Sequence, residues 1–208
     1  MRRILFAAIV FAGVAMTASA TEEPAFETVA SDGRIEIRQY DPIIVAETEV
    51  SGGMRDASSS GFRVLADYIF GNNKARSEIA MTAPVTRTPS TKIEMTAPVT
   101  RTPSDGGNWT VSFTMPSKWT METLPVPNNP AVSIREVPGE LMATIRFSGS
   151  GRMETHREKQ AELEDWMASN GYEATGPARY AGYDAPWKPS PLRRNEVLIP
   201  VTPAEPKT

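Results

Sequence analysis

The sequence predicts an α+β fold, in which a distorted antiparallel β-barrel with two flanking helices is assembled from two ββαββ halves. The first observation is an internal repeat: Ile35–Gly52 aligns without a gap with Val132–Gly149, at an offset of 97 residues. The second is that each repeat is followed by a helical pattern and then by further strand patterns. The halves extend over about residues 34–116 and 132–201, and approximate two-fold symmetry should relate them.

The first twenty residues differ in composition from the rest of the chain. Two arginines precede an apolar run, Ile4–Met16, that is short for a bilayer span, and small residues follow it up to Ala20. This pattern predicts a secretory signal peptide at residues 1–20. We therefore expect a single exported domain at residues 21–208, periplasmic or secreted, with no membrane span after cleavage.

The composition excludes several classes of function. The chain has no cysteine, one histidine and a formal net charge of −3. A zinc site would lack ligands, and an acidic chain without a basic run is a poor candidate for nucleic-acid binding. A Gly-x-Ser-x-Gly elbow, a P-loop and a dinucleotide fingerprint are all missing. We expect no catalytic residues, no structural metal and a non-enzymatic function.

The first half begins with a predicted hairpin, formed by a strand, a turn at Asp41-Pro42 and a second strand. A helix follows, because apolar residues from Phe62 to Ile69 recur at helical spacing. Gly71-Asn72 should end this helix. The remaining strands of this half are expected at Ile79–Thr86, Ile93–Thr100 and Trp109–Met115.

The second half repeats this plan, with a hairpin turn at Pro138-Gly139. Thr155 and Glu158 are spaced as a capping box at the start of its helix. The apolar stripe of that helix consists of Leu163, Trp166 and Met167, and Asn170-Gly171 should end it. Strands are expected at Ala178–Tyr183 and Glu196–Val201.

A second, closer repeat lies inside the first half. Ile79–Ser90 and Ile93–Ser104 differ only at Ala80 and Glu94, at a period of 14 residues. They are interpreted as two ordinary half-buried strands. Because proline cannot donate to a sheet ladder, both should lie at an edge or a bulge.

Two features suggest ligand contacts. His156 is expected in the first helical turn, where the helix dipole keeps it neutral and able to ligate a metal; the alternative is an ordinary surface residue. The segment Tyr183–Glu196 concentrates aromatic residues, prolines and the cations Lys188, Arg193 and Arg194. It suits a flat apolar ligand with carboxylates, or it is a loop packed by Trp187 with its arginines paired to carboxylates.

Several motifs occur in the order found in one known family. They are Glu36–Tyr40, Gly61–Asn73, Met81–Val85, Met95–Val99, Phe113–Pro116, Gly182–Pro189 and Arg193–Glu196. With these motifs the chain resembles the SOUL heme-binding protein family, over roughly residues 26–201.

The resemblance implies that heme or a porphyrin binds in an apolar cleft on the first helix. The residues it assigns to the ligand, or that stand near the assigned positions, are Phe62, Arg63, Leu65, Ile69, Lys188 and Arg193. Gln39 stands where some members carry a proposed axial histidine, which leaves His156 as the alternative iron ligand. Ser59 and Asp67 replace basic residues of other members, and Arg63 is the candidate to substitute for them.

The leading hypothesis is a non-enzymatic carrier, buffer or sensor of heme or a related tetrapyrrole in the periplasm, with an unknown protein partner. An alternative is an effector- or protein-binding module that keeps this fold without heme. A third is an enzyme acting on tetrapyrroles, for which the sequence offers no catalytic constellation.

Overall fold

The computed structural model describes residues 21–76 and 90–204. The first half contains β1 (Phe26–Asp32), β2 (Ile35–Tyr40), β3 (Ile43–Val50), α1 (Met54–Ile69), β4 (Asn73–Lys74), β5 (Val99–Pro103) and β6 (Trp109–Thr114). The second contains β8 (Ser133–Val137), β9 (Leu141–Ser148), α2 (Met153–Ser169), β10 (Tyr172–Ala174), β11 (Arg179–Gly182) and β12 (Arg194–Pro203). The short strand β7 (Val126–Pro127) lies between the halves, and 3-10 turns occur at Asp105–Gly107 and Ser190–Leu192.

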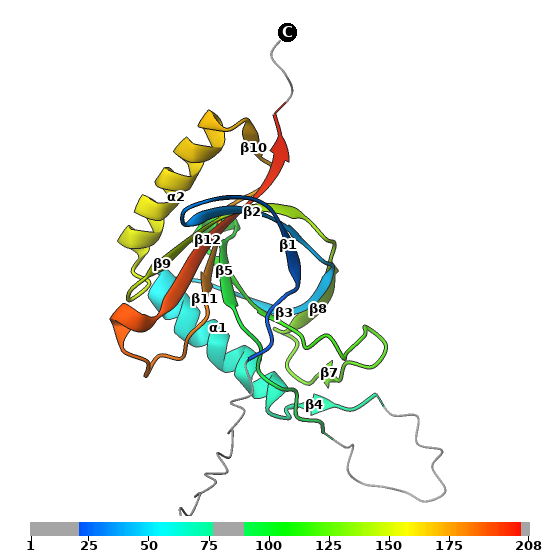
Figure 1. The fold of residues 1–208 in the computed structure, drawn as a ribbon. Coiled ribbons are helices and arrows are strands. Elements are labelled where there is room, and N and C mark those ends of the chain that lie inside the picture. The colour runs from blue at the N-terminus through cyan, green and yellow to red at the C-terminus, as the bar shows by residue number, and fades with distance from the viewer. Residues whose placement is uncertain (1–20, 77–89, 205–208) are drawn as a thin grey trace, which may run out of the picture.

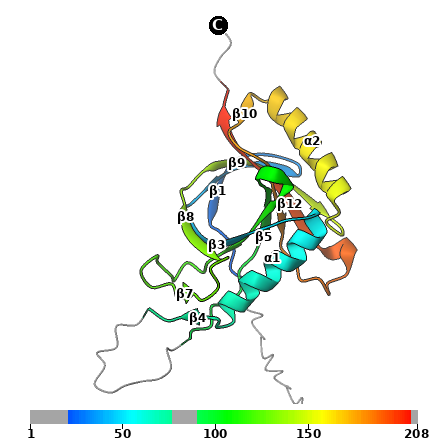
Figure 2. The ribbon, with the colours of Figure 1, turned by 180° about the vertical axis from the view of Figure 1, so that it is seen from behind.

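One large antiparallel sheet forms the body of the molecule, in the order β1-β2-β9-β12-β11-β5-β6-β3-β8, with β10 beside β12. The sheet curls until its end strands, β1 and β8, come close to each other, and both helices lie outside it (Figures 1 and 2). No ladder of the described residues joins β1 to β8. The predicted α+β fold with two flanking helices is confirmed, as an open, curled sheet rather than a closed barrel.

The strand order confirms the duplicated plan. Each strand of the first half has a counterpart in the second: β2 corresponds to β8, β3 to β9, β5 to β11 and β6 to β12. When every strand is replaced by its counterpart, the order from β2 to β8 becomes its own reverse. The order reverses between β5 and β11, where Arg101 pairs with Tyr180. The pseudo-two-fold axis therefore passes between these two strands.

The predicted hairpins are wrong, because the halves exchange their first strands. β2 pairs with β9, where Ile37 lies opposite Ala143, and β3 pairs with β8, where Ala46 lies opposite Ile134. The two registers are symmetry-equivalent. The short connections between β2 and β3 and between β8 and β9 thus join strands that are not neighbours in the sheet, instead of forming hairpins. An apolar pattern determines which face of a strand is buried, but not which strand lies beside it.

Both helices pack on the outer face of the sheet, as predicted. α1 buries Leu65 and Ile69 against the first half, and α2 buries Leu163 and Met167 against the second. Within residues 21–76 and 90–204, neither helix has the length and apolar character needed to cross a bilayer.

The predicted capping box of α2 is wrong. The helix begins at Met153, so Thr155 lies inside it, and the preceding Arg152 makes no side-chain cap. Gly151 has a φ of +65°, a conformation that favours glycine, and it turns the chain into the helix earlier than the Thr155 signal suggested. Both predicted helix ends are correct to within one or two residues, at Phe70 and Asn170.

The twin repeat behaves differently from the prediction. Its first copy, at residues 79–90, lies almost entirely outside the described residues. In the second copy the strand begins only at Val99, one residue after Pro98. This strand, β5, lies in the middle of the sheet between β11 and β6, so the predicted edge position is wrong. The proline is tolerated because it precedes the ladder. Strands β1 and β10 were not predicted.

Candidate functional site

Four of the predicted ligand residues lie on α1. Leu65 and Ile69 are buried in the core, and Phe62 is half-buried with its ring centroid 5.4 Å from that of Phe113. Arg63 is exposed, and its Nε donates to the carbonyl of Ser59. In this conformation α1 offers mainly a polar outer face.

The other two predicted residues lie in the loop between β11 and β12, which is fixed by its own hydrogen bonds. Asp184 accepts from Nζ of Lys188 at 2.6 Å and from the backbone N–H of Arg194 at 2.6 Å. Arg193 donates from Nε to the carbonyl of Lys188 at 2.7 Å and also to that of Pro186. The loop therefore holds Lys188 and Arg193 next to each other.

This rigid loop carries exposed apolar side chains. Trp187 is 85% exposed and Leu192 is 64% exposed, so the interpretation of a loop packed by Trp187 is wrong. The interpretation of paired cations holds in part, because Arg194 pairs with Glu23 and stacks over the Tyr183 ring. An exposed tryptophan beside two cations is a suitable surface for a flat, apolar, anionic molecule.

His156 is not a surface residue, contrary to that sequence interpretation. It is 0% exposed and lies between the rings of Phe147 and Tyr180, at centroid distances of 5.1 and 4.9 Å. Burial, and then the charge of Arg101, lower its pKa to about 4. Nδ1 lies 3.0 Å from the carbonyl of Arg152, while Nε2 has no hydrogen-bond partner in the described part of the chain.

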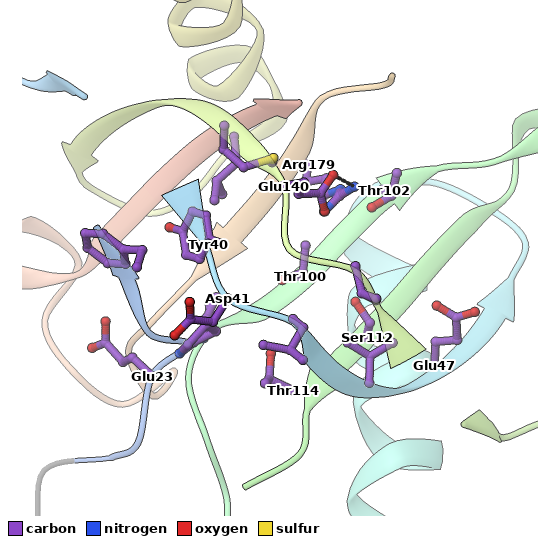
Figure 3. Close-up of a pocket in the computed structure, with 18 of the residues that line it drawn as sticks. Glu23, Tyr40, Asp41, Glu47, Thr100, Thr102, Ser112, Thr114, Glu140 and Arg179 are labelled. Atoms are coloured by element: carbon purple, nitrogen blue, oxygen red, sulfur yellow. Dashed lines mark hydrogen bonds and ion pairs between the residues drawn. The ribbon is translucent and has the colours of Figure 1, made fainter. Parts of the chain in front are cut away.

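The inner face of the curled sheet is polar, because strand residues alternate between its two faces. In β6, Trp109, Val111 and Phe113 are buried, whereas the residues between them line a cavity. The cavity has a volume of about 330 Å³. Hydroxyl groups from β5 and β6 form one wall, as Figure 3 shows for Thr100, Thr102, Ser112 and Thr114.

Charged and aromatic groups complete the cavity (Figure 3). Its acidic residues are Glu23, Asp41, Glu47 and Glu140, and its basic residues are Arg135 and Arg179. Both arginines are paired, Arg135 with Glu47 at 2.9 Å and Arg179 with Glu140 at 2.6 Å. The rings of Phe26, Tyr40 and Tyr183 also line it.

The corresponding inner face of the second half is filled. Glu196 accepts hydrogen bonds from Arg38 at 2.9 Å and from the hydroxyl of Tyr183 at 2.6 Å. Arg38 also donates to Glu36 and Tyr40. Burial, the largest single effect, would lower the pKa of Arg38, but the charges of Glu196 and Tyr40 and the hydrogen bonds to both together outweigh it and raise the pKa above its usual value.

The cavity residues were not among those predicted from the sequence. The signal that could have found them is the alternation in Trp109–Thr114, where hydroxyl residues occupy every second position. Such alternation indicates a strand with one apolar and one polar face. It does not tell whether the polar face lines a cavity or the outer surface. In the described residues, no group of three or more His, Asp or Glu side chains could hold a metal ion.

A model described as SOUL heme-binding protein matches residues 21–200. No curated protein matches the sequence.

Among solved structures, the C-terminal domain of EcmrR aligns with a TM-score of 0.60 and 13% identity, over 82% of this chain and 98% of that one. EcmrR in a DNA complex aligns with a TM-score of 0.57 and 12% identity, over 82% of this chain and 57% of that one. A protein described as a hydrolase from Listeria innocua aligns with a TM-score of 0.54 and 15% identity, over 84% and 94%. At such identities the likeness shows the fold alone.

Proposed function

The chain belongs to the SOUL heme-binding protein family, and we propose that it binds heme or a related tetrapyrrole without catalysing a reaction. Its role is that of a carrier, buffer or sensor. The observation that supports this most directly, beyond the family, is the fixed loop between β11 and β12. It presents Trp187 and Leu192 to solvent next to Lys188 and Arg193.

Trp187 and Leu192 supply the apolar contact for the face of the macrocycle. Burial of an aromatic side chain contributes about 1.5–3 kcal/mol. Arg193, which donates only to backbone carbonyls, lies where a propionate group could be paired, whereas Lys188 would share its charge between a propionate and Asp184, its ion-pair partner. Exposed pairs of this kind contribute roughly 0–1 kcal/mol each. The energy of binding therefore comes mainly from the apolar contact, with charge setting the orientation of the ligand.

Iron coordination by histidine does not fit this site. His156, the one histidine in the chain, is fully buried between two aromatic rings. Gln39, at the position of a proposed family ligand, is exposed and donates to the carbonyl of Tyr40. The macrocycle is therefore held without a histidine ligand, and bound heme would supply no chemistry that these residues direct.

The test is a titration of residues 21–208 with hemin and with iron-free protoporphyrin, followed at the Soret band. Both should saturate at 1:1 with similar affinity. Lys188→Ala should weaken binding about two- to fivefold, because a partly exposed charge is lost. The control is Lys118→Ala, which removes an exposed lysine outside this loop and should change nothing. If neither ligand saturates, the proposal is wrong. If only hemin binds, the macrocycle is not held without an iron ligand, and that part of the proposal is wrong.

The proposed location is the periplasm, after removal of residues 1–20. The support is the arginine, apolar and small-residue pattern of that segment. The mass of the protein recovered from a periplasmic extract should correspond to a chain beginning at Thr21. Recovery of the full-length chain from the cytoplasm would contradict export.

A second candidate function, an effector-binding module without heme, is favoured by the cavity on the inner face. Its size lies at the lower end of the range for small-molecule sites, about 300–1,000 Å³. Of the β11–β12 loop, only Tyr183 lines this cavity, and the loop residues proposed for the tetrapyrrole do not.

A further inference from the structure

We propose that the cavity inside the curled sheet is a binding site for a small organic cation with an apolar or aromatic part. This inference rests on the second candidate function and names its ligand class. It does not depend on tetrapyrrole binding, because the loop residues proposed for the tetrapyrrole do not line the cavity, to which their loop contributes only Tyr183.

The charge of the cavity selects the ligand class. Four carboxylates and two guanidinium groups line it, and each guanidinium is paired with one of the carboxylates. Glu23 pairs with Arg194. This leaves Asp41 as the lining carboxylate without an ion-pair partner among the described residues. A cation inside the cavity would be attracted, whereas a dicarboxylate such as heme would be repelled.

The walls next to Asp41 suit the apolar part of such a ligand. Tyr40 and Phe26 lie on the same side of the cavity as Asp41, with their ring centroids 5.1 Å apart. Figure 3 shows Glu23, Asp41 and Tyr40 together at this side. Aromatic rings attract cations through their π faces. Because the guanidinium of Arg38 already lies over the Phe26 ring, 4.5 Å from its centroid, Tyr40 is the ring that a ring-bearing ammonium ion could meet together with the carboxylate.

The opposite wall offers hydrogen bonds. Thr100 pairs with Ser112 and Thr102 with Thr110 across β5 and β6. Among the described residues, none of these four side chains is hydrogen-bonded to another protein group. Hydroxyl groups both donate and accept, so this wall tolerates several polar substituents. The specificity of the site therefore comes from the carboxylate and the rings, not from this wall.

Small side chains keep the cavity open. The pairing of β3 with β6 is equivalent to that of β9 with β12. Ser112 lies opposite Glu47, and Leu198 lies opposite Thr144, the repeat counterpart of Glu47. Ser112 therefore corresponds to Leu198. In the same way Thr110 corresponds to Glu196. The second half fills these positions with larger side chains, and the substitution Ser112→Leu would copy that arrangement into the first half.

The test uses three probes of similar size: benzylammonium, benzyl alcohol and benzoate. Binding to the protein is measured by ligand-observed NMR titration near pH 7. Benzylammonium should bind saturably and at least about tenfold more tightly than benzyl alcohol, because one ion pair of moderate strength supplies that factor. Benzoate should bind most weakly.

Two variants locate the site. Asp41→Asn should reduce benzylammonium binding to the level of benzyl alcohol, and Ser112→Leu should abolish binding of both. Asp165→Asn, which removes an exposed carboxylate on α2, should leave both unchanged. Circular dichroism and the melting temperature verify that each variant is folded.

Equal binding of benzylammonium and benzyl alcohol would overturn the charge assignment. Undiminished binding in a folded Ser112→Leu variant, or no saturable binding of any probe, would overturn the site. The tetrapyrrole proposal is judged separately by the hemin titration, so failure of one is distinguishable from failure of the other.

Discussion

Arg38 and Arg135 are related by the internal repeat, yet their surroundings differ. The side chain of Arg38 is 8% exposed and lies in a network with Glu196, whereas that of Arg135 is 54% exposed and pairs with Glu47 at the cavity. The two strands have equivalent registers. The backbone of the duplicated fold has therefore been kept, while one inner face has been filled and the other left hollow.

This difference shows where the halves have specialised. In the second half, large side chains and a buried ion pair occupy the inner face, and the exposed features lie outside, in the β11–β12 loop. In the first half, hydroxyl side chains leave a cavity. The candidate tetrapyrrole site thus lies in the β11–β12 loop, whereas the cavity lies on the inner face of the sheet and is lined by residues of both halves.

The largest expected effect comes from breaking the buried pair. Arg38→Ala removes the closer cation of the buried Glu196 and leaves only Arg194, 3.9 Å away, which should lower the free energy of unfolding by about 3–5 kcal/mol. The equivalent change Arg135→Ala removes an exposed pair and should cost less than about 1 kcal/mol. Urea denaturation measures both. Equal losses would contradict the view that the two inner faces differ.

The second prediction concerns the core under α2. The pKa of His156 in the folded protein is about 4, against a usual value of 6.5. The unfolded chain therefore binds this proton more tightly than the folded one. The stability that His156 contributes should be complete above about pH 6.5 and be lost as the pH falls toward 4.

His156→Phe keeps an aromatic ring between Phe147 and Tyr180 but cannot titrate. Between pH 7 and pH 4.5 the wild type should lose roughly 2 kcal/mol more than this variant, because each pKa unit corresponds to about 1.4 kcal/mol. Urea denaturation at several pH values gives the two curves. Parallel curves would mean that the histidine is not buried as described.

The smallest of these effects concerns the close contact between α1 and β6. A Cβ at Gly61 would lie 2.6 Å from Cγ2 of Val111, so α1 touches β6 through a glycine. Gly61→Ala should destabilise the protein by about 1–2 kcal/mol through overpacking, despite the better helix propensity of alanine. Gly53→Ala, where a Cβ meets nothing within 4 Å, is the control. An equal or higher melting temperature for Gly61→Ala would argue against this close contact.

The sequence was sufficient for the fold class because the repeat and the helical patterns are local signals. It was insufficient for strand pairing, since Ile37 and Ile134 look like hairpin residues whether their partners lie in the same half or in the other. It also failed for β5, where Pro98 suggested an edge. Which neighbour a strand takes depends on contacts far apart in the chain, and these leave no periodic pattern.

The candidate sites were predictable only in part. The cations of the β11–β12 loop and the exposed Trp187 could be found from composition, because proline-rich loops present side chains at the surface. The burial of His156 could not, since helix position does not reveal which face meets the core. The cavity depends on the size difference between Ser112 and Leu198, which becomes meaningful only when the strands are known to be equivalent.

The measurement that tests the central claim most directly is a hemin titration of three proteins: wild type, Trp187→Ala and Ser112→Leu. The tetrapyrrole is proposed to bind the outer loop, and a different ligand the cavity. Wild type and Ser112→Leu should therefore bind hemin alike, and Trp187→Ala should bind about 10- to 100-fold more weakly, the loss of one aromatic contact. Weaker binding in Ser112→Leu with no change in Trp187→Ala would contradict it.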